Sequence, residues 1–146
     1  VHHGNGSQEI FYNDKTVAYG SIHQSPLFPG TGSEKEIGVG NIFNVPIESG
    51  TNGKEFIGAF NNKILEKLDL FKPDIILISA GFDAHQRDPL ANINLNSKDF
   101  YEITKGIVQI AENHSQGRII SFLEGGYDLI ALAESSYQHL LALADI

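Results

Sequence analysis

The sequence predicts an α/β fold built on a three-layer parallel sheet, and three observations support this prediction. Residues 75–78 are branched and apolar, and Pro73 and Gly81 bound them, a pattern typical of a strand buried on both faces of a parallel sheet. Strand and helix patterns alternate along the second half of the chain, as expected when right-handed crossovers join parallel strands. Polar residues directly follow several expected strands, and the carboxyl ends of parallel strands share one edge.

Local patterns define the expected elements in chain order. They are a helical turn at 9–13, strands at 16–23 and 41–47, a helix at 54–70, the strand that starts near Asp74, a helix at 97–111, a strand at 118–123 and a helix at 129–144. Residues 16–23 are rich in strand formers, whereas two prolines and two glycines exclude regular structure from the loop at 25–33. In 54–70 the apolar residues fall at helical spacing on one face, and Pro73 prevents continuation. Ser97 is the expected N-cap of the next helix because acidic residues follow in the first turn.

The composition limits the classes of protein to which the chain can belong. A length of 146 residues suits one hydrophobic core, and a net charge of −8 argues against a nucleic-acid binder. No apolar segment approaches the ~20 residues that span a bilayer. Cysteine is absent, so a metal would have histidine and carboxylate ligands, and a cytoplasmic location, or a nuclear one in a eukaryote, is expected. Methionine is also absent and the chain opens on Val1, from which we expect upstream residues to have been removed.

Four groups of polar residues are expected to meet at the carboxyl edge of the sheet. They are His2 with His3, Ser21 with His23, Asp83 with His85, and Glu124 with Tyr127. Ligands bind at this edge in open α/β sheets, so one site explains all four groups better than four coincidences. An Asp and a His without Cys suggest a metal with oxygen and nitrogen ligands, and a catalytic zinc site usually has three protein ligands. An acid just before Val1 would complete the set, on the same side of an extended backbone as His2.

Several of these residues also have a purely structural interpretation. Asp83 is equally suited to capping the segment that follows it, and adjacent histidines near a terminus can be the remnant of a tag. Phe28, in the loop rich in proline and glycine, either folds back on the core or forms an aromatic wall of a substrate channel. Tyr127 follows two glycines, a position that suits a phenol approaching a polarised carbonyl.

Three segments together resemble the zinc-dependent histone deacetylase family. They are Val1-His2-His3-Gly4-Asn5-Gly6, then Ser79-Ala80-Gly81-Phe82-Asp83-Ala84-His85 with Asp88-Pro89-Leu90, and then Leu123-Glu124-Gly125-Gly126-Tyr127. Their order extends over essentially the whole chain, and Asn5 is most similar to the class II and acetylpolyamine amidohydrolase-like branch. The resemblance implies the arginase/deacetylase type of sheet, incomplete at its N-terminal side. Residues 1–146 would then be the C-terminal portion of a single catalytic domain.

The resemblance also implies roles for individual residues. His2 and Asp83 match two of the three ligands of the Zn²⁺ cofactor in this family. Tyr127 matches the tyrosine that hydrogen-bonds the scissile carbonyl. Phe28 matches an aromatic residue of the acyl-lysine channel. Asn5 matches the position that orients one histidine of the catalytic pair.

A monovalent cation, K⁺ or Na⁺, is also implied beside the zinc. Its ligands match Ser21 together with the carbonyl groups of Ile22 and His2. The family's third zinc ligand and its paired general-base histidines, by contrast, have no match in this chain. The histidines at positions 3, 23 and 85 are not expected to replace them.

The activity implied for the parent protein is hydrolysis of an acetylamide, in an acetylated protein or an acetylpolyamine, to acetate and a free amine. This chain alone is expected to be inactive. Two other functions stay open: an arginase-like dimetal hydrolase, with Asp88 as the candidate additional acid, and a non-catalytic module that binds an acetylated ligand or a partner. Neither nucleic acid nor a membrane is expected as a partner. An uncovered apolar sheet face on the truncated side favours self-association.

Overall fold

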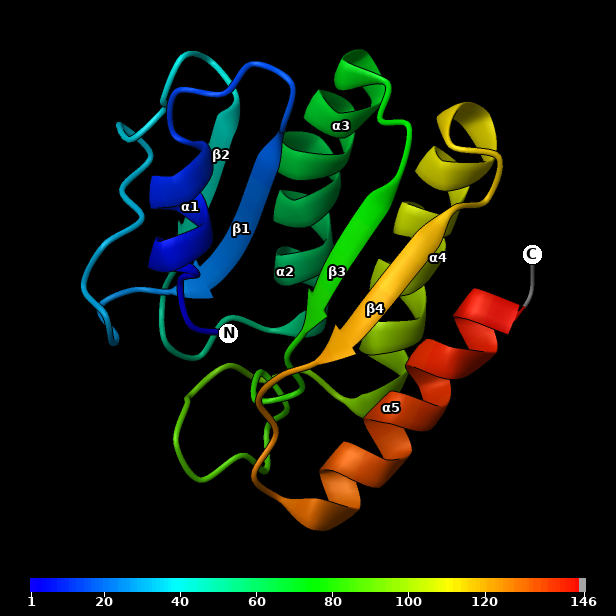
Figure 1. The fold of residues 1–146 in the computed structure, drawn as a ribbon. Helices are drawn as coiled ribbons and strands as arrows, with labels where there is room; N and C mark the ends of the chain where they lie inside the picture. Colours follow the sequence, from blue (N-terminus) through cyan, green and yellow to red (C-terminus); the bar gives the residue numbers. More distant parts are fainter. Residues whose placement is uncertain (145–146) are drawn as a thin grey trace.

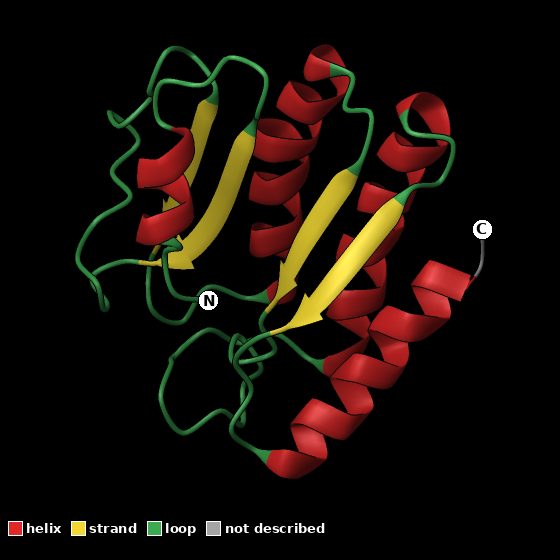
Figure 2. Cartoon of the chain, in the orientation of Figure 1, coloured by secondary structure: helices red, strands yellow, loops and turns green. Residues whose placement is uncertain are grey.

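The computed structural model describes residues 1–144 as helices alternating with parallel strands (Figure 1; Figure 2). The strands are β1 (Tyr19–Gln24), β2 (Ile42–Ile47), β3 (Ile76–Ala80) and β4 (Ile119–Leu123). The helices are α1 (Asn5–Phe11), α2 (Gly53–Phe60), α3 (Glu66–Phe71), α4 (Ser97–His114) and α5 (Leu129–Ala144), with a π-helical segment η1 (Asn61–Leu65) between α2 and α3. The α/β class is therefore confirmed. Within residues 1–144, no helix has the length and apolar character that crossing a membrane requires.

The strands form two parallel pairs. β1 pairs with β2 in a register that begins with Tyr19 opposite Ile42, and β3 pairs with β4 beginning with Ile76 opposite Ile119. All four arrows in Figure 1 point the same way, so the carboxyl ends of the strands lie at one edge of the molecule. This arrangement confirms the shared edge at which polar residues were expected to gather.

The hydrophobic core lies between the strands and the helices that cover one of their faces. In Figure 1, α2, α3 and α4 lie behind the strands, whereas α1 lies on the near side, beside β1 and β2. Large buried side chains of this core include Val45, Phe56, Ile93, Leu95 and Ile107. Burial of such side chains is the main favourable contribution to the stability of a fold of this size.

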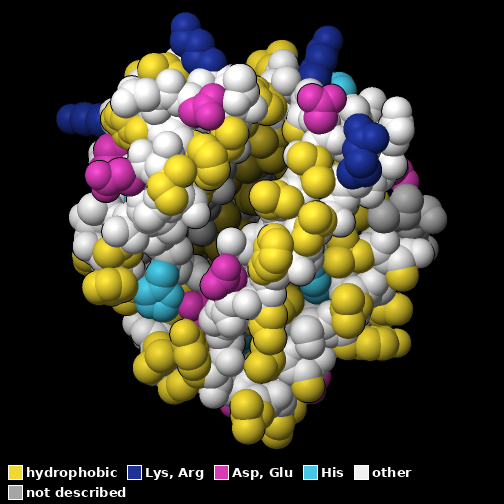
Figure 3. Space-filling model, in the orientation of Figure 1, with side chains coloured by type: hydrophobic (Ala, Val, Ile, Leu, Met, Phe, Trp, Pro, Cys, Tyr) yellow, Lys and Arg dark blue, Asp and Glu magenta, His cyan; other side chains and the backbone are white. Residues whose placement is uncertain are grey.

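The expectation that β3 is buried on both faces is wrong for the chain as described. Ile76 and Ala80 are buried, but Leu77 is 63% exposed, and β4 likewise exposes Ile120 and Phe122. Successive side chains of a strand point to opposite faces, so one face of this pair packs on the core and the other is open. Figure 3 shows hydrophobic side chains gathered on the open face. The continuous apolar run thus indicates a strand whose two faces are both suited to burial. Within residues 1–144, other elements cover only one of these faces.

The expected helix at 54–70 is correct in position but is not a single α-helix. The π-helical segment η1 divides it, and Ile64 of that segment is buried. A Cβ atom added to Gly20 of β1 would lie 2.8 Å from Ile64 Cγ2. The interrupted helix therefore packs closely against β1, a contact that helical periodicity alone does not predict.

Several element bounds also differ from the expectations, and β1 begins at Tyr19 rather than at residue 16. The N-cap of α4 is Asn96 rather than Ser97, because Asn96 has an extended backbone and forms a reciprocal capping box with Asp99. At the other end of the chain, α1 begins at Asn5, earlier than the helical turn expected at 9–13. The last helix, by contrast, has the bounds expected from its apolar pattern.

Candidate functional site

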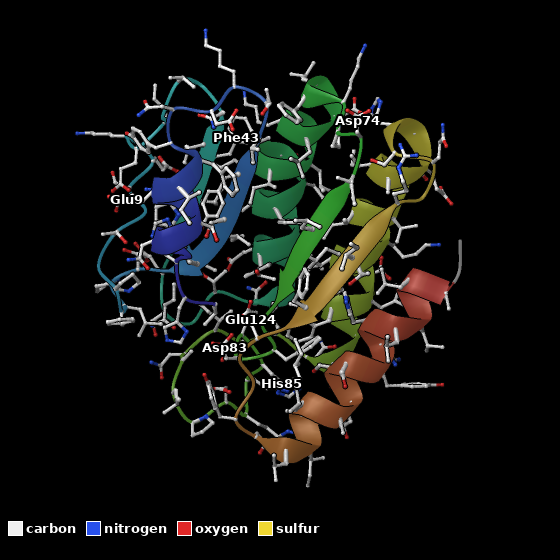
Figure 4. All side chains as sticks on the ribbon, in the orientation of Figure 1. Glu9, Phe43, Asp74, Asp83, His85 and Glu124 are labelled. Atoms are coloured by element: carbon white, nitrogen blue, oxygen red, sulfur yellow. The ribbon has the colours of Figure 1, made fainter. Side chains whose placement is uncertain are left out.

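Asp83 and His2 meet at the carboxyl edge of the strands, although 81 positions separate them in the sequence. His2 Nδ1 lies 2.8 Å from Asp83 Oδ2, and the Val1 nitrogen lies 2.5 Å from Asp83 Oδ1. The Asp83 residue is only 2% exposed. Figure 4 shows Asp83 just beyond the ends of β3 and β4, with Glu124 also labelled there. The structure thus brings together the two residues that the sequence indicated as metal ligands.

A glycine makes room for the buried carboxylate. A Cβ atom added to Gly125 would lie 2.6 Å from Asp83 Oδ2, which is too close for any other residue. The carbonyl oxygen of Gly125 accepts a hydrogen bond from the Phe82 backbone at 2.7 Å. The segment after β4 therefore packs directly on the segment after β3, and this close approach explains the glycine that precedes Gly126 and Tyr127.

The donor atoms fit part of a zinc site. An imidazole nitrogen and a carboxylate oxygen that face each other are the ligand types that zinc accepts in a protein without cysteine. Within residues 1–144, no group of three or more His, Cys, Asp or Glu side chains is placed to hold a metal ion. His2 and Asp83 would therefore hold zinc only with further ligands.

Tyr127 lies at the same edge and is held there by Asp88. The Tyr127 backbone nitrogen donates to Asp88 Oδ2 at 3.0 Å, and the Tyr127 residue is 53% exposed. Asp88 Oδ1 accepts hydrogen bonds from the backbone nitrogens of Leu90 and Ala91. Because backbone donors engage both of its oxygens, Asp88 organises this loop, and this role argues against it as the ligand of a second metal.

His85 is buried and serves as a connector. Its Nδ1 accepts a hydrogen bond from the Arg87 backbone, so Nε2 carries the proton and faces the Ser97 hydroxyl at 3.2 Å. Ser97 in turn donates to Glu134 of α5. Burial lowers the pKa of His85, which favours this neutral form. With both ring nitrogens engaged, His85 ties the loop after Asp83 to α4 and α5.

His3 and His23 form a buried pair beside the metal-ligand segment. Their ring centroids are 4.8 Å apart, and His23 Nε2 lies 3.0 Å from the Gly32 carbonyl oxygen. That oxygen only accepts, so Nε2 carries the proton and Nδ1 accepts from the Ser21 hydroxyl, 3.0 Å away. Burial, followed by the neighbouring His3, lowers the pKa of His23 to about 4. Neither histidine is arranged as a solvent-accessible base.

The remaining predicted site residues are not among the hydrogen-bond partners of the Asp83 side chain, which are Val1 and His2. Phe28, in the loop between β1 and β2, is 78% exposed, so the interpretation that it folds back on the core is wrong. Asn5 is the exposed first residue of α1, and Ser21 and Ile22 are half-buried on β1. The roles of these four residues stay predictions.

Sequence reasoning missed a set of polar residues that surrounds His3. They are Gln8, Thr31, Glu36 and Asn44. The one available signal was the Gly-Thr-Gly sequence at 30–32, because glycine often marks a close approach of the backbone to another group. The partners of a buried amide depend on the fold, and no local pattern in the sequence identifies them.

Comparisons with known proteins point to one family. A model of the histone deacetylase domain matches residues 1–143. The chain is 40% identical over 147 residues to "Histone deacetylase 14, chloroplastic" of Arabidopsis thaliana and 47% identical over 150 residues to a "Probable deacetylase" of Methanothermobacter thermautotrophicus, each alignment covering 98% of this chain. The crystal structure of the HDA15 HD domain aligns with 99% of this chain at a TM-score of 0.91 and 35% identity.

The chain spans less than half the length of these proteins. It covers 35% of the Arabidopsis protein, 44% of the Methanothermobacter protein and 42% of the HDA15 chain. The similarity therefore concerns one part of each of these proteins. In the HDA15 structure, that part aligns with 99% of this chain.

Proposed function

Because this chain belongs to the histone deacetylase family and has its arginase/deacetylase type of α/β fold, we propose that the protein containing it is a zinc-dependent deacetylase. It would hydrolyse an acetylamide, in an acetylated lysine side chain or an acetylpolyamine, to acetate and a free amine. Residues 1–146 would form the C-terminal portion of a single catalytic domain. A cytoplasmic location stays a prediction, since the Arabidopsis relative is named chloroplastic.

The observation that carries this proposal is the contact between His2 and Asp83. A carboxylate with 2% exposure is costly to bury without a cationic or hydrogen-bonding partner. An imidazole nitrogen 2.8 Å away and a glycine packed against the same carboxylate leave a polar corner at the strand ends. Such a corner is where open α/β sheets bind their ligands.

In the proposed reaction, the residues of this chain hold the metal and the substrate. Zinc, when bound by His2 and Asp83, would supply Lewis-acid polarisation of the acetyl carbonyl. The Tyr127 hydroxyl would donate a hydrogen bond to the carbonyl oxygen as negative charge develops there, and removing a donor of this kind costs roughly 3–4 kcal/mol in other acyl-transfer enzymes. Phe28 would line the channel, and Asn5 would orient one of the general-base histidines.

The third zinc ligand and the general base would come from residues that precede Val1. Two features support this part of the proposal. Within residues 1–144, β1 and β3 belong to separate two-stranded sheets. Val1 bridges their carboxyl ends, because its carbonyl oxygen accepts from the Gln24 backbone and its nitrogen lies against Asp83. A preceding strand between β1 and β3 would end at this point, with an acid next to Val1 on the same side as His2.

A monovalent cation beside the zinc also belongs to the proposal. The Ser21 hydroxyl donates its proton to His23 Nδ1, so its oxygen lone pairs are left to face a cation. Oxygen atoms, including backbone carbonyls such as those of Ile22 and His2, are suitable ligands for hard cations of this kind. A dimetal hydrolase of the arginase type is less well supported, because both oxygens of Asp88 accept backbone hydrogen bonds.

Replacing Asp83 tests the proposal directly. In the protein expressed from its complete reading frame, Asp83→Asn should lower both the zinc content, measured by elemental analysis, and the hydrolysis of an acetyl-lysine peptide. Asp74→Asn makes the same chemical change at an exposed position at the other end of the same strand and serves as the matched control. Full zinc content with unchanged hydrolysis in Asp83→Asn would rule out Asp83 as a ligand. Two zinc ions per molecule in the wild type would favour the dimetal alternative.

A further inference from the structure

A polar network joins the segment that carries the candidate metal ligand His2 to the loop that carries Phe28. On the metal side, His3 Nε2 lies 2.9 Å from Gln8 Oε1. Gln8 Nε2 donates to Glu36 Oε2 at 2.6 Å. Gln8 is 7% exposed and His3 is 4% exposed, so their hydrogen bonds are shielded from competing water. Residues 2–8 and the end of the loop at 25–36 are therefore linked through one buried amide.

Asn44 of β2 determines the direction of the hydrogen bonds of Gln8 and, through Gln8, of His3. Its side-chain nitrogen lies 2.6 Å from Gln8 Oε1 and within 3.4 Å of the carbonyl oxygens of Ser33 and Glu36. Backbone carbonyls only accept, so Asn44 must present its amide nitrogen to this cluster. The Gln8 atom that faces Asn44 is then the oxygen, and the Gln8 nitrogen necessarily faces Glu36.

The same direction determines the tautomer of His3. Because Gln8 Oε1 is an acceptor, the proton of the neutral ring lies on His3 Nε2. His3 Nδ1 then accepts from the Thr31 hydroxyl at 2.8 Å. His3 is thus held from both ring nitrogens, and it directly follows His2, whose Nδ1 faces Asp83. The orientation of a metal ligand is sensitive to such supporting contacts.

The Glu36 carboxylate also holds the loop at 25–36, which lies at the other end of the network. It accepts from the backbone nitrogens of Gly32 and Ser33 at 3.0–3.2 Å. Gly32 has a φ of +90°, and a Cβ atom there would lie 2.5 Å from His23 Nε2 and 2.7 Å from His3 Cδ2. The loop therefore passes directly over the two imidazole rings. The hydrogen bond from Gln8, followed by the one from Ser33, holds the pKa of Glu36 below its ordinary value.

We propose that Glu36 is a positioning residue for the deacetylation proposed above: through Gln8 and His3 it orients the segment of His2, and through Gly32 it holds the loop of Phe28. One carboxylate thereby couples the metal side of the site to the channel side. The catalytic part of this inference rests on the proposed function, whereas the coupling of the two segments does not.

Exchanging the two side chains is the sharpest test. In Glu36→Gln, the new amide cannot accept from both Gln8 and the loop nitrogens, because one of its two ends is a donor. In Gln8→Glu, two carboxylates face each other. In the double variant with both changes, the carboxylate now at position 8 accepts from His3, from Asn44 and from the amide now at position 36. The oxygen of that amide accepts from the Gly32 and Ser33 nitrogens, as Glu36 Oε1 does in the wild type. Every donor of the network then has an acceptor again, with one link reversed, and only the second contact of the Gly32 nitrogen, with Oε2, is lost. Only a role that depends on this hydrogen-bond pattern predicts rescue by the exchange.

Three measurements on the protein from its complete reading frame decide the outcome. In each single variant we expect kcat/KM for an acetyl-lysine peptide and the affinity for zinc to fall about 10–100-fold. Limited proteolysis in the loop at 25–36 should become faster, and the ¹⁵N signals of His3 should lose the pattern of the Nε2–H tautomer. The double variant should recover all of these properties. Glu34→Gln removes a carboxylate from the same loop, where Glu34 pairs with Lys63 at 2.7 Å on the surface, and should behave as the wild type.

The outcomes separate this inference from the proposed function. A wild-type protein without deacetylase activity would defeat the proposed function, while loop proteolysis and the His3 signals would still test the coupling. A double variant no better than the single variants would overturn the inference, as would a Glu36→Gln variant with wild-type proteolysis and His3 signals. If a single variant fails to fold, recovery of folded protein in the double variant supports the pairing of positions 8 and 36. If the double variant also fails to fold, the pairing is refuted.

Discussion

Buried His23 makes the stability of the protein sensitive to mild acid. The ring is 2% exposed and lies beside His3 and below Gly32. Its pKa of about 4 in the folded protein is lower than the value near 6.5 expected when the chain is unfolded. Between these two values the unfolded state binds more protons than the folded state, so stability falls as the pH decreases through this window.

The size of the effect follows from the difference between the two pKa values. Each unit of difference is worth about 1.4 kcal/mol. The His23 contribution should therefore cost about 2 kcal/mol at pH 5 and about 3 kcal/mol at pH 4, relative to neutral pH. Burial also lowers the pKa values of His85 and His139, and these rings act in the same direction. The His23 share must be isolated with a variant.

His23→Gln provides that variant, because its amide nitrogen can still donate to the Gly32 carbonyl but does not titrate. Urea unfolding of both proteins is compared at about pH 7.5 and about pH 5, with a zinc chelator present so that metal release does not contribute. The wild type should lose about 2 kcal/mol more than His23→Gln between the two conditions. Equal losses in the wild type and His23→Gln would refute the reasoning.

Asn96→Ala removes the side-chain half of the capping box of α4 and should lower the free energy of urea unfolding by about 1 kcal/mol; no change would show that the cap is not formed in solution. Phe56→Ala removes a core side chain that is 5% exposed and should cost about 3–5 kcal/mol, measured in the same way. The purified 146-residue chain should self-associate through the open face of β3 and β4. The double variant Leu77→Lys with Phe122→Lys should therefore shift the sedimentation of the chain towards the monomer. Association that persists in this variant would identify another surface. The same chain with added zinc should not measurably hydrolyse a fluorogenic acetyl-lysine substrate, since the loss of a general base alone costs about 10²–10⁴ in rate. Turnover that a chelator abolishes would contradict this last prediction.

Periodicity predicted the class and order of the elements because it reports local physical preferences. The apolar spacing at 129–144 gave the bounds of α5 correctly, since a run of this length presents several turns of one face. It did not predict the π-helical turn within the helix at 54–70, which accompanies the packing of Ile64 on Gly20. Nor did it distinguish Asn96 from Ser97 as the cap, because both residue types suit that position.

The burial of β3 was mispredicted for a different reason. A continuous apolar run indicates that both faces of a strand are compatible with burial, but it does not specify which element supplies the cover. In residues 1–144 the cover comes from one side only, and Leu77 and Phe122 are exposed on the other. The apolar sequence of a strand therefore indicates that both faces suit burial, but the element that covers a face does not have to lie in the same segment of chain.

Some residues of the candidate site can be predicted from local sequence, whereas others are recognised only in the folded structure. His2 and Asp83 were predictable because each lies in a short motif next to a strand end, and parallel strands bring such ends to one edge. Glu36, Gln8 and Asn44 were not, because their contact spans 8 to 36 positions and uses ordinary polar residues. A metal ligand can be recognised from its own chemistry, whereas a residue that holds the ligand in place is defined only by its partners. The hydrogen-bond directions that Asn44 imposes supply that missing definition, and they make the exchange of Gln8 and Glu36 a test of the structure itself.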